Sequence, residues 1–341
     1  MIAAASGAPA ARTTLPAEYR VARAGAVVVD RPDVEPLLVR GKDGLDLLHR
    51  LSTNAVKQLP AGCGAATVFT THKGRILDLV SVHRVADGSL LLCGASRARM
   101  VREWIERYTF REEVTVQDLP AGFGTLGLHG ARARDLATRL LGAEAASLPI
   151  HAVIPLAGAG FAVRSFPLGG ESFLIVAPGE VIDRLRGEAL AASGMEVAAA
   201  GRECLELLRI EAGLPAAGHE LGEEYNPWEA RLQDAIALDK GCYVGQEVIA
   251  RLNTYKKVSR QLVRLTAAEL PMPGSPIRPA AQADLHTGAG EVVTSSAQVP
   301  GPAGRAIALG YVRGEDALPG RAVQIVHAGR AIGATVEGVA R

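Results

Sequence analysis

The chain has 341 residues, of which 48% are hydrophobic and 21% are charged, and its formal net charge is +1. This length exceeds that of one ordinary core, so we expect two or three domains. The near-neutral charge excludes an overall bias toward nucleic acids or anionic membranes, and no apolar run of about 18 residues is available to span a membrane. The four cysteines are widely spaced and form no zinc-binding motif, which indicates free thiols in a reducing, cytoplasmic environment.

The first two thirds of the chain alternate between strand and helix patterns. Residues 65–70 and 76–85 are expected to pair as strands, because residues 71–75 form a short turn with a glycine in it. Residues 98–108 carry apolar side chains on one helical face, and residues 131–141 repeat this pattern. This order of strands and helices indicates a mixed α/β or α+β fold, not a doubly wound sheet. Shorter strands are expected at 26–29, 37–39, 90–92, 114–116, 125–128, 161–164 and 173–176.

The character of the chain changes after Lys257. Residues 258–341 contain short β-type runs separated by proline and glycine, and they show no helical period. This pattern is typical of a small β-barrel or sandwich. Residues 216–234, by contrast, are polar and acidic, and they are expected to form a long loop with a helical end. The β-type runs lie at 261–265, 291–294, 307–312, 322–326 and 334–337.

The most unusual stretch is Lys240 to Glu247, with the sequence KGCYVGQE. Two glycines within eight residues favour a turn with positive φ or a close approach by another group. The stretch lacks the length and the trailing Lys-Ser/Thr of a phosphate-binding loop. Cys242 can be a nucleophile if a neighbouring group lowers its pKa, or it can be a buried thiol in a structural turn. We therefore expect a ligand-facing turn, with the role of its thiol left open.

Two other segments combine polar groups at predicted helix ends. In Arg209 to Gly213, with the sequence RIEAG, the arginine can bind a carboxylate and Glu211 can accept bonds from a donor-rich ring edge. The alternative is an ordinary salt bridge at a helix end. Asn54 ends a helix and either caps it or faces a ligand.

A run of basic residues follows the KGCYVGQE stretch. It is either a solvated face or an anion site, such as one for a polyglutamate tail or RNA. Its members are Arg251, Lys256, Lys257, Arg260 and Arg264.

Together these residues resemble the YgfZ-type folate-binding proteins, which belong to the superfamily of the glycine-cleavage T protein, a folate-dependent aminomethyltransferase. The stretch from Lys240 to Glu247 is similar to the K-G-C-Y-x-G-Q-E signature of that family. The resemblance covers the chain from about Val39 to Val312. Further similar segments are residues 51–56 (L-T-N-D-V), 74–79 (G-R-i-l-x-D), 209–213 (R-x-E-A-G), 291–296 (G-x-v-T-S) and 308–312 (A-L-G-Y-v).

The resemblance implies an α+β, three-domain T-protein-like ring around a central channel, with ferredoxin-like α/β domains and a C-terminal Greek-key β-barrel. The N-terminal arm is expected at 1–30, and the first α/β domain at 31–120, completed by 203–255. The second α/β domain is expected at 121–202 and the barrel at 258–341.

The resemblance also implies a tetrahydrofolate-binding accessory protein, with or without a polyglutamate tail on the folate. Its partners would be iron–sulfur enzymes or assembly factors, including enzymes that modify tRNA, and it would act as a cytoplasmic monomer with no membrane attachment. Cys242 is its key thiol. One thiol cannot hold a cluster, which takes about four ligands, so a partner would supply the others. The implied folate-binding residues are Asn54, Glu171, Arg209, Glu211, Tyr243, Gln246 and Arg251.

Two departures separate the chain from the transferase of this superfamily. Met100 stands where we place the catalytic aspartate, and Gly170 stands where a glutamate would contact the pterin, with Glu171 one residue later. We therefore expect aminomethyl transfer to be lost. The alternatives are a one-carbon (aminomethyl) transferase that uses another acid, or a module that binds tRNA or a modifying enzyme without folate.

Overall fold

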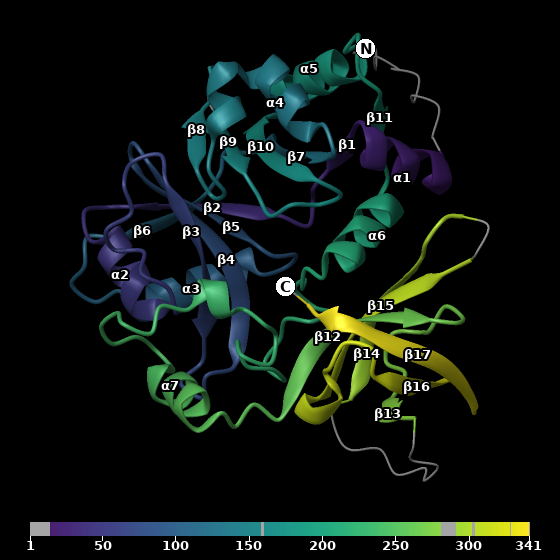
Figure 1. Cartoon of the computed structure of the whole chain (residues 1–341). Coiled ribbons are helices and arrows are strands. Elements are labelled where there is room, and N and C mark those ends of the chain that lie inside the picture. Colours follow the sequence, from purple (N-terminus) through teal and green to yellow (C-terminus); the bar gives the residue numbers. More distant parts are fainter. Residues whose placement is uncertain (1–13, 158–159, 281–290, 302–303, 328, 341) are drawn as a thin grey trace, which may run out of the picture.

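The computed structural model describes residues 14–157, 160–280, 291–301, 304–327 and 329–340. Three β-sheets with helices between and around them make up this part of the chain (Figure 1). Among the described residues, no helix is long and apolar enough to cross a membrane. The mixed α/β composition expected for the first two thirds and the strand-rich C-terminal region are both confirmed.

The first sheet has the strand order β3-β4-β5-β2-β6, and helices α2 and α3 pack on it. The predicted pair of strands is confirmed, with Thr67 opposite Val80 in an antiparallel register. Leu48 of α2 and Trp104 of α3 are buried against the sheet, and for α3 the apolar pattern of residues 98–108 predicted this. The elements are β2 Glu35–Arg40, α2 Gly44–Leu51, β3 Gly64–Thr70, β4 Ile76–Val85, β5 Gly88–Cys93, α3 Ala98–Arg107 and β6 Thr115–Asp118.

The second sheet has the order β11-β1-β7-β10-β9-β8, with α4 and α5 packed on one face. Within the segment expected as an N-terminal arm, residues 15–30 form helix α1 (Leu15–Ala24) and β1 (Ala26–Asp30), and β1 pairs with both β11 and β7. The other elements are β7 Phe123–Gly130, α4 Ala133–Leu141, η1 Ala143–Ser147, β8 Val153–Pro155, β9 Phe161–Arg164, β10 Glu171–Pro178, α5 Gly179–Leu190 and β11 Val197–Ala199.

The C-terminal sheet has the order β13-β16-β17-β12-β15-β14. Its two edges meet, because Pro276 bridges Val292 and the Ile277 N–H donates to the Glu291 carbonyl at 3.1 Å. The strands therefore curl into a half-closed barrel. The elements are β12 Arg260–Ala267, β13 Ile277–Pro279, β14 Val292–Gln298, β15 Ala306–Arg313, η3 Gly314–Asp316, β16 Ala322–His327 and β17 Arg330–Val339.

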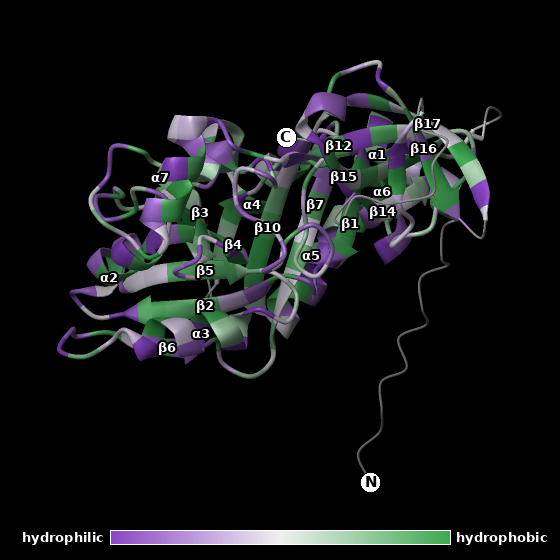
Figure 2. Cartoon of the chain, turned by 90° about the horizontal axis from the view of Figure 1, so that it is seen from below, coloured by the Kyte–Doolittle hydropathy of each residue, from purple (hydrophilic) through white to green (hydrophobic). Residues whose placement is uncertain are grey.

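Apolar faces join the sheets to one another. Leu90 and Leu92 of β5 pack against Val163 of β9 and Leu174 of β10, so the two α/β sheets share a core. Figure 2 shows apolar colouring along β5 and β10. Burial of such side chains contributes about 1.5–3 kcal/mol each, which makes this contact a strong constraint on how the two sheets sit.

Helix α6 (Arg202–Ala212) lies where all three sheets meet (Figure 1). Leu205 and Leu208 face α1 and the second sheet. Leu207 and Ile210, on another side of the helix, pack in a cluster with residues of the first sheet and the barrel, such as Val68. A helix that is apolar on two sides is typical of a buried position, so α6 is the central support of the fold.

A buried carboxylate ties α6 to the barrel. Glu220, in the loop after α6, is 0% exposed and accepts a bond from Arg209 at 2.8 Å. It also accepts bonds from the hydroxyls of Thr294 and Ser295, both at 2.6 Å. Tyr311 of β15 donates to the Glu220 carbonyl at 2.7 Å. Because these bonds join residues of α6, of the following loop and of the barrel, they fix the three segments together.

A second buried acid is only partly satisfied. Asp78 on β4 is 1% exposed, and its Oδ2 accepts the Gly94 N–H at 2.9 Å. Its Oδ1 has no hydrogen-bond partner among the described residues. Burial raises the pKa of Asp78 to about 7, so this carboxyl group holds its proton up to near-neutral pH.

Replacing Glu220 by Leu should destabilise the protein by about 3–5 kcal/mol, because it removes one of the two carboxylates that pair with Arg209 and takes a buried acceptor from the Thr294 and Ser295 hydroxyls. The double variant Arg209→Met/Glu220→Leu should regain part of that loss. Urea denaturation followed by circular dichroism measures both. Glu247→Gln, at an exposed position on helix α7 (Gln246–Tyr255), serves as the control. A loss below about 1 kcal/mol in the single variant would contradict the role given to this network.

Asp78→Asn should reduce the pH dependence of stability. The folded pKa of about 7 lies above the ordinary value of 3.8, so the folded state binds the proton more tightly and loses stability as pH rises from about 4 to 7. Between pH 5 and 8 the variant should lose about 3 kcal/mol less than the wild type, as an order of magnitude. Urea denaturation at both pH values tests this. Asp183→Asn, at an exposed side chain on α5, should behave like the wild type; equal curves for all three proteins would refute the prediction.

Candidate functional site

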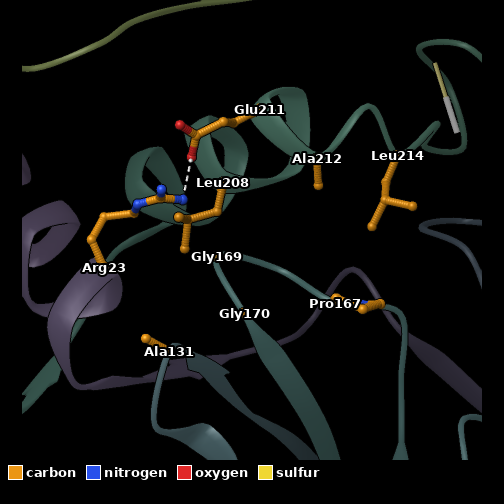
Figure 3. A pocket seen from close by; sticks show the side chains of 9 residues that line it. All are labelled: Arg23, Ala131, Pro167, Gly169, Gly170, Leu208, Glu211, Ala212 and Leu214. Carbon is orange, nitrogen blue, oxygen red and sulfur yellow. Dashed lines mark hydrogen bonds and ion pairs between the residues drawn. The ribbon is translucent and has the colours of Figure 1, made fainter. Parts of the chain in front are cut away.

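A pocket of about 470 Å³ lies between the C-terminal end of α6, helix α1 and the turn before β10. We call it the α6 pocket. Its volume falls within the range of about 300–1,000 Å³ that is usual for small-molecule sites. Figure 3 shows the side chains around it. The lining residues are Arg23, Ala131, Pro167, Gly169, Gly170, Leu208, Glu211, Ala212 and Leu214.

Glu211 supplies the carboxylate of this pocket. Its Oε1 accepts a bond from the Tyr19 hydroxyl at 2.8 Å, and Arg23 approaches its Oε2 at 3.5 Å, as the dashed line in Figure 3 marks. Burial, together with the bond to Glu211, raises the pKa of Tyr19 to about 12, so the phenol stays protonated and keeps donating. Because a carboxylate has about four acceptor positions, Glu211 retains capacity for a ligand.

Two glycines bring the backbone close to this pocket. Gly169 has φ +66° and Gly170 has φ +143°. A Cβ at Gly169 would lie 2.9 Å from a methyl group of Leu208, and one at Gly170 would lie 2.5 Å from the Gly130 carbonyl oxygen. No side chain fits at position 170 without moving the backbone, which gives a physical reason for the absence of a glutamate there.

Glu171 and Arg209, two of the predicted folate-binding residues, do not line the pocket. The Glu171 carboxylate pairs with Arg134 at 2.8 Å and with Arg164 at 2.7 Å. Burial by itself would raise the pKa of Glu171, but the two guanidinium groups bring it below its ordinary value.

Arg209 is held in the buried network of α6. It pairs with Glu206 and Glu220, and it also bonds to the Ser295 hydroxyl at 2.7 Å. Burial opposes its charge, yet the two carboxylates keep its pKa above the ordinary value. Arg209 thus supports the pocket wall from behind while its neighbour Glu211 faces the pocket.

The remaining predicted residues gather around the KGCYVGQE turn, which anchors itself on the end of α2. The Lys240 ammonium donates to the carbonyls of Ser52 at 2.6 Å and Asn54 at 2.8 Å, and also to that of His49. Burial lowers the pKa of Lys240 to about 8. The amine lies 4.8 Å from the centre of the Tyr243 ring, a distance suited to a cation–π contact.

The side chains of this second group have distinct surroundings. Asn54 donates to the Ala66 carbonyl at 2.8 Å and accepts from the Ala55 N–H at 2.8 Å, so it stabilises the end of α2. Tyr243 is buried. Gln246 begins α7, and Arg251 is exposed on α7 with no ion-pair partner among the described residues.

Cys242 is the one exposed cysteine of the four. The chain just after Cys242 is fixed, because the Val244 N–H donates to the Arg50 carbonyl at 3.1 Å and the Val244 carbonyl accepts from the Thr70 hydroxyl at 2.8 Å. Gly245 takes φ +84° at the start of α7. The turn therefore holds its thiol toward solvent. Among the described residues, no three His, Cys, Asp or Glu side chains come together as a metal site.

Tyr19 and Arg23 are site residues that sequence reasoning missed, because they lie in the segment expected as a loose arm. One signal was available: Pro16 is at the start of a helix with Glu18 in its first turn, a combination typical of helix N-termini. Their meeting with Glu211, nearly two hundred residues away along the chain, depends on the tertiary fold.

Comparisons with known proteins agree with this architecture. An aminomethyltransferase of Saccharopolyspora erythraea is 27% identical over 325 residues, covering 93% of this chain and 86% of that protein. A chloroplastic transferase-like protein of Arabidopsis thaliana is 30% identical over 258 residues, or 74% of this chain, and the match spans 59% of that relative's length. The crystal structure of glycine cleavage system aminomethyltransferase T from Bartonella henselae has a TM-score of 0.83 and 23% identity, covering 95% of this chain and 88% of that one.

The structural similarity shows that the fold is that of aminomethyltransferase T, as the sequence resemblance implied. The division into three domains, with the boundaries given above, stays a prediction. Residues 8–240 match the GCVT N-terminal domain family. Since this match covers well over half of the sequence, the chain belongs to the GCVT N-terminal domain family.

Proposed function

We propose that this chain binds a reduced folate, with or without a polyglutamate tail, in the α6 pocket. The observation that carries the proposal is the Glu211 carboxylate, which lines the pocket beside the Gly169–Gly170 turn. The pterin ring of a folate presents an amino group and ring N–H donors along one edge, and a carboxylate can accept two such bonds together. Leu208 and Leu214 supply apolar surface for a flat ring.

When bound, tetrahydrofolate would supply one-carbon carrier chemistry. The residues of this chain bind and orient it, with Glu211 held in place by Tyr19 and Arg23. The similarity to the aminomethyltransferase of Saccharopolyspora erythraea supports the proposal, because the T-protein superfamily that the sequence resembles is folate-dependent. Direct contacts of Asn54, Glu171, Arg209, Tyr243, Gln246 and Arg251 with folate stay predictions.

We further propose that the chain is a YgfZ-type accessory protein that uses folate and Cys242 in the assembly or repair of iron–sulfur enzymes, including tRNA-modifying ones. Two features support this role: the KGCYVGQE sequence, and the exposure of the Cys242 thiol outside the lining of the α6 pocket. A thiol turned toward solvent is placed to meet a partner protein that supplies further ligands. We expect a cytoplasmic monomer that docks transiently on its client.

Folate-dependent aminomethyl transfer is the second candidate, because the Saccharopolyspora erythraea relative, which matches 93% of this chain, is an aminomethyltransferase. Met100 packs on α3 within the core of the first sheet and offers no acid. Asp78 is an acid with a pKa of about 7, which suits proton transfer near neutral pH. It is buried and does not line the α6 pocket, so this candidate needs Asp78 to gain access to the ligand.

Glu211→Gln should weaken tetrahydrofolate binding by about 10- to 100-fold, because charge-assisted bonds to the carboxylate are lost. Isothermal titration calorimetry with tetrahydrofolate under anaerobic conditions measures this. Glu196→Gln is the matched control, since Glu196 also pairs with an arginine of α1 but is half exposed and outside the pocket. Absence of binding by the wild type, or an equal loss in both variants, would remove the basis for a folate site here.

Cys242→Ala should leave tetrahydrofolate affinity within about twofold of the wild type, because the thiol lies outside the pocket, and should abolish iron–sulfur enzyme activity in cells that depend on this protein. Cys63→Ala, at another partly accessible thiol, is the control and should keep that activity. Full cellular activity of Cys242→Ala would exclude the accessory role.

Aminomethyl turnover that Asp78→Asn abolishes would instead establish the second candidate.

A further inference from the structure

The structure divides the basic run after the KGCYVGQE turn into two parts. Arg260 pairs with the buried Glu229, and Arg264 pairs with Glu337. These two arginines are therefore held in ion pairs at the barrel. Arg251 lies on α7, and Lys256 and Lys257 follow its C-terminal end. All three are exposed, and no acidic side chain pairs with them among the described residues. None of these three cations lines the α6 pocket.

Helix α7 projects from the body of the protein. Its one fully buried side chain is Ile249, and Figures 1 and 2 show the helix at the outer edge of the molecule. The β3–β4 turn packs against it, since a Cβ at Gly74 would lie 3.2 Å from Val248. This contact places exposed Lys73 beside the helix. We call the set Lys73, Arg251, Tyr255, Lys256 and Lys257 the α7 patch.

The end of α7 directs its lysines outward at a conformational cost. Lys256 has φ +49° and ψ +36°, a left-handed conformation that costs a non-glycine residue about 1–2 kcal/mol. The helix closes on it through the Lys256 N–H to the Asn253 carbonyl at 3.3 Å and the Lys257 N–H to the Leu252 carbonyl at 3.2 Å. Glycine is the usual residue at this position. Cations near a helix C-terminus also complement the helix dipole, but that effect does not explain the tyrosine beside them.

Tyr255 is 65% exposed. The Lys257 amine lies 5.9 Å from the centre of its ring, and among the described residues no other aromatic ring packs on it. An exposed aromatic face flanked by unpaired cations is the arrangement with which proteins bind single-stranded nucleic acids, since every base can stack on the ring while the cations meet phosphates. An acidic protein segment would need the cations alone.

We propose that the α7 patch binds single-stranded nucleic acid, with Tyr255 stacking on a base and the surrounding cations contacting the phosphates. The acidic side chain of this helix, Glu247, lies in its first turn, eight residues and about 12 Å along the axis from Tyr255. The patch shares no residue with the α6 pocket. We therefore expect nucleic acid to bind here without displacing a folate from the α6 pocket.

Fluorescence anisotropy with a labelled twelve-nucleotide oligouridine RNA tests this, using the full chain at low and moderate salt. Tyr255→Ala should weaken binding by about tenfold, as loss of one stacking contact predicts. Lys256→Glu/Lys257→Glu should weaken binding further and should reduce the slope of log K against log salt by about 1.4, which corresponds to two phosphate contacts on a single strand. Tetrahydrofolate affinity should not change in either variant.

Arg99→Glu/Arg330→Glu is the matched control, because it makes the same change in net charge at two exposed side chains on α3 and β17. It should keep wild-type RNA affinity. The proposal is overturned if the wild type does not bind the RNA at low salt, if the control loses as much affinity as the lysine variant, or if polyglutamate competes at equal charge and Tyr255→Ala has no effect, which would identify an acidic protein segment as the ligand.

Discussion

The ion pair between Arg209 and the fully buried Glu220 is the contact on which the rest of the molecule depends. A charge without a partner in this position would cost several kcal/mol, so the helix, the following loop and the barrel hydroxyls must be in place together. The apolar residues on two sides of α6 add non-directional attraction to the same junction. Hydrophobic burial brings the sheets together, and the buried charges fix how α6, the following loop and the barrel meet.

This use of α6 explains where the candidate ligand site lies. Arg209 points inward and makes its hydrogen bonds within the protein. Glu211 lies at the C-terminal end of α6, where it contacts Tyr19 and Arg23 of α1. A pocket at the end of a rigid helix needs little rearrangement to hold its carboxylate in position. The glycine turn opposite completes it by removing side chains from the approach.

The KGCYVGQE turn holds an exposed thiol in a fixed position. Lys240 neutralises the carbonyl end of α2, as cations at helix C-termini do, and bonds on both sides of Cys242 leave only a short exposed arch. The chain then continues directly into α7 with its unpaired cations. One continuous segment thus carries two exposed chemical features, both outside the folate pocket, and either can face a macromolecular partner.

The sequence by itself determined the local elements and the class of the protein. Alternating and helical apolar patterns identified β3, β4, α3 and the strand-rich C-terminus, because these periods follow from backbone geometry alone. It also showed that RIEAG and KGCYVGQE carry unusual chemistry. Only the tertiary structure decided that Glu211 faces a pocket while Arg209 and Glu171 are held in internal ion pairs. It also decided that α1 contributes to the α6 pocket and that Arg251 does not line it. Such assignments depend on which charges find partners across long distances in the chain, and no local pattern specifies that.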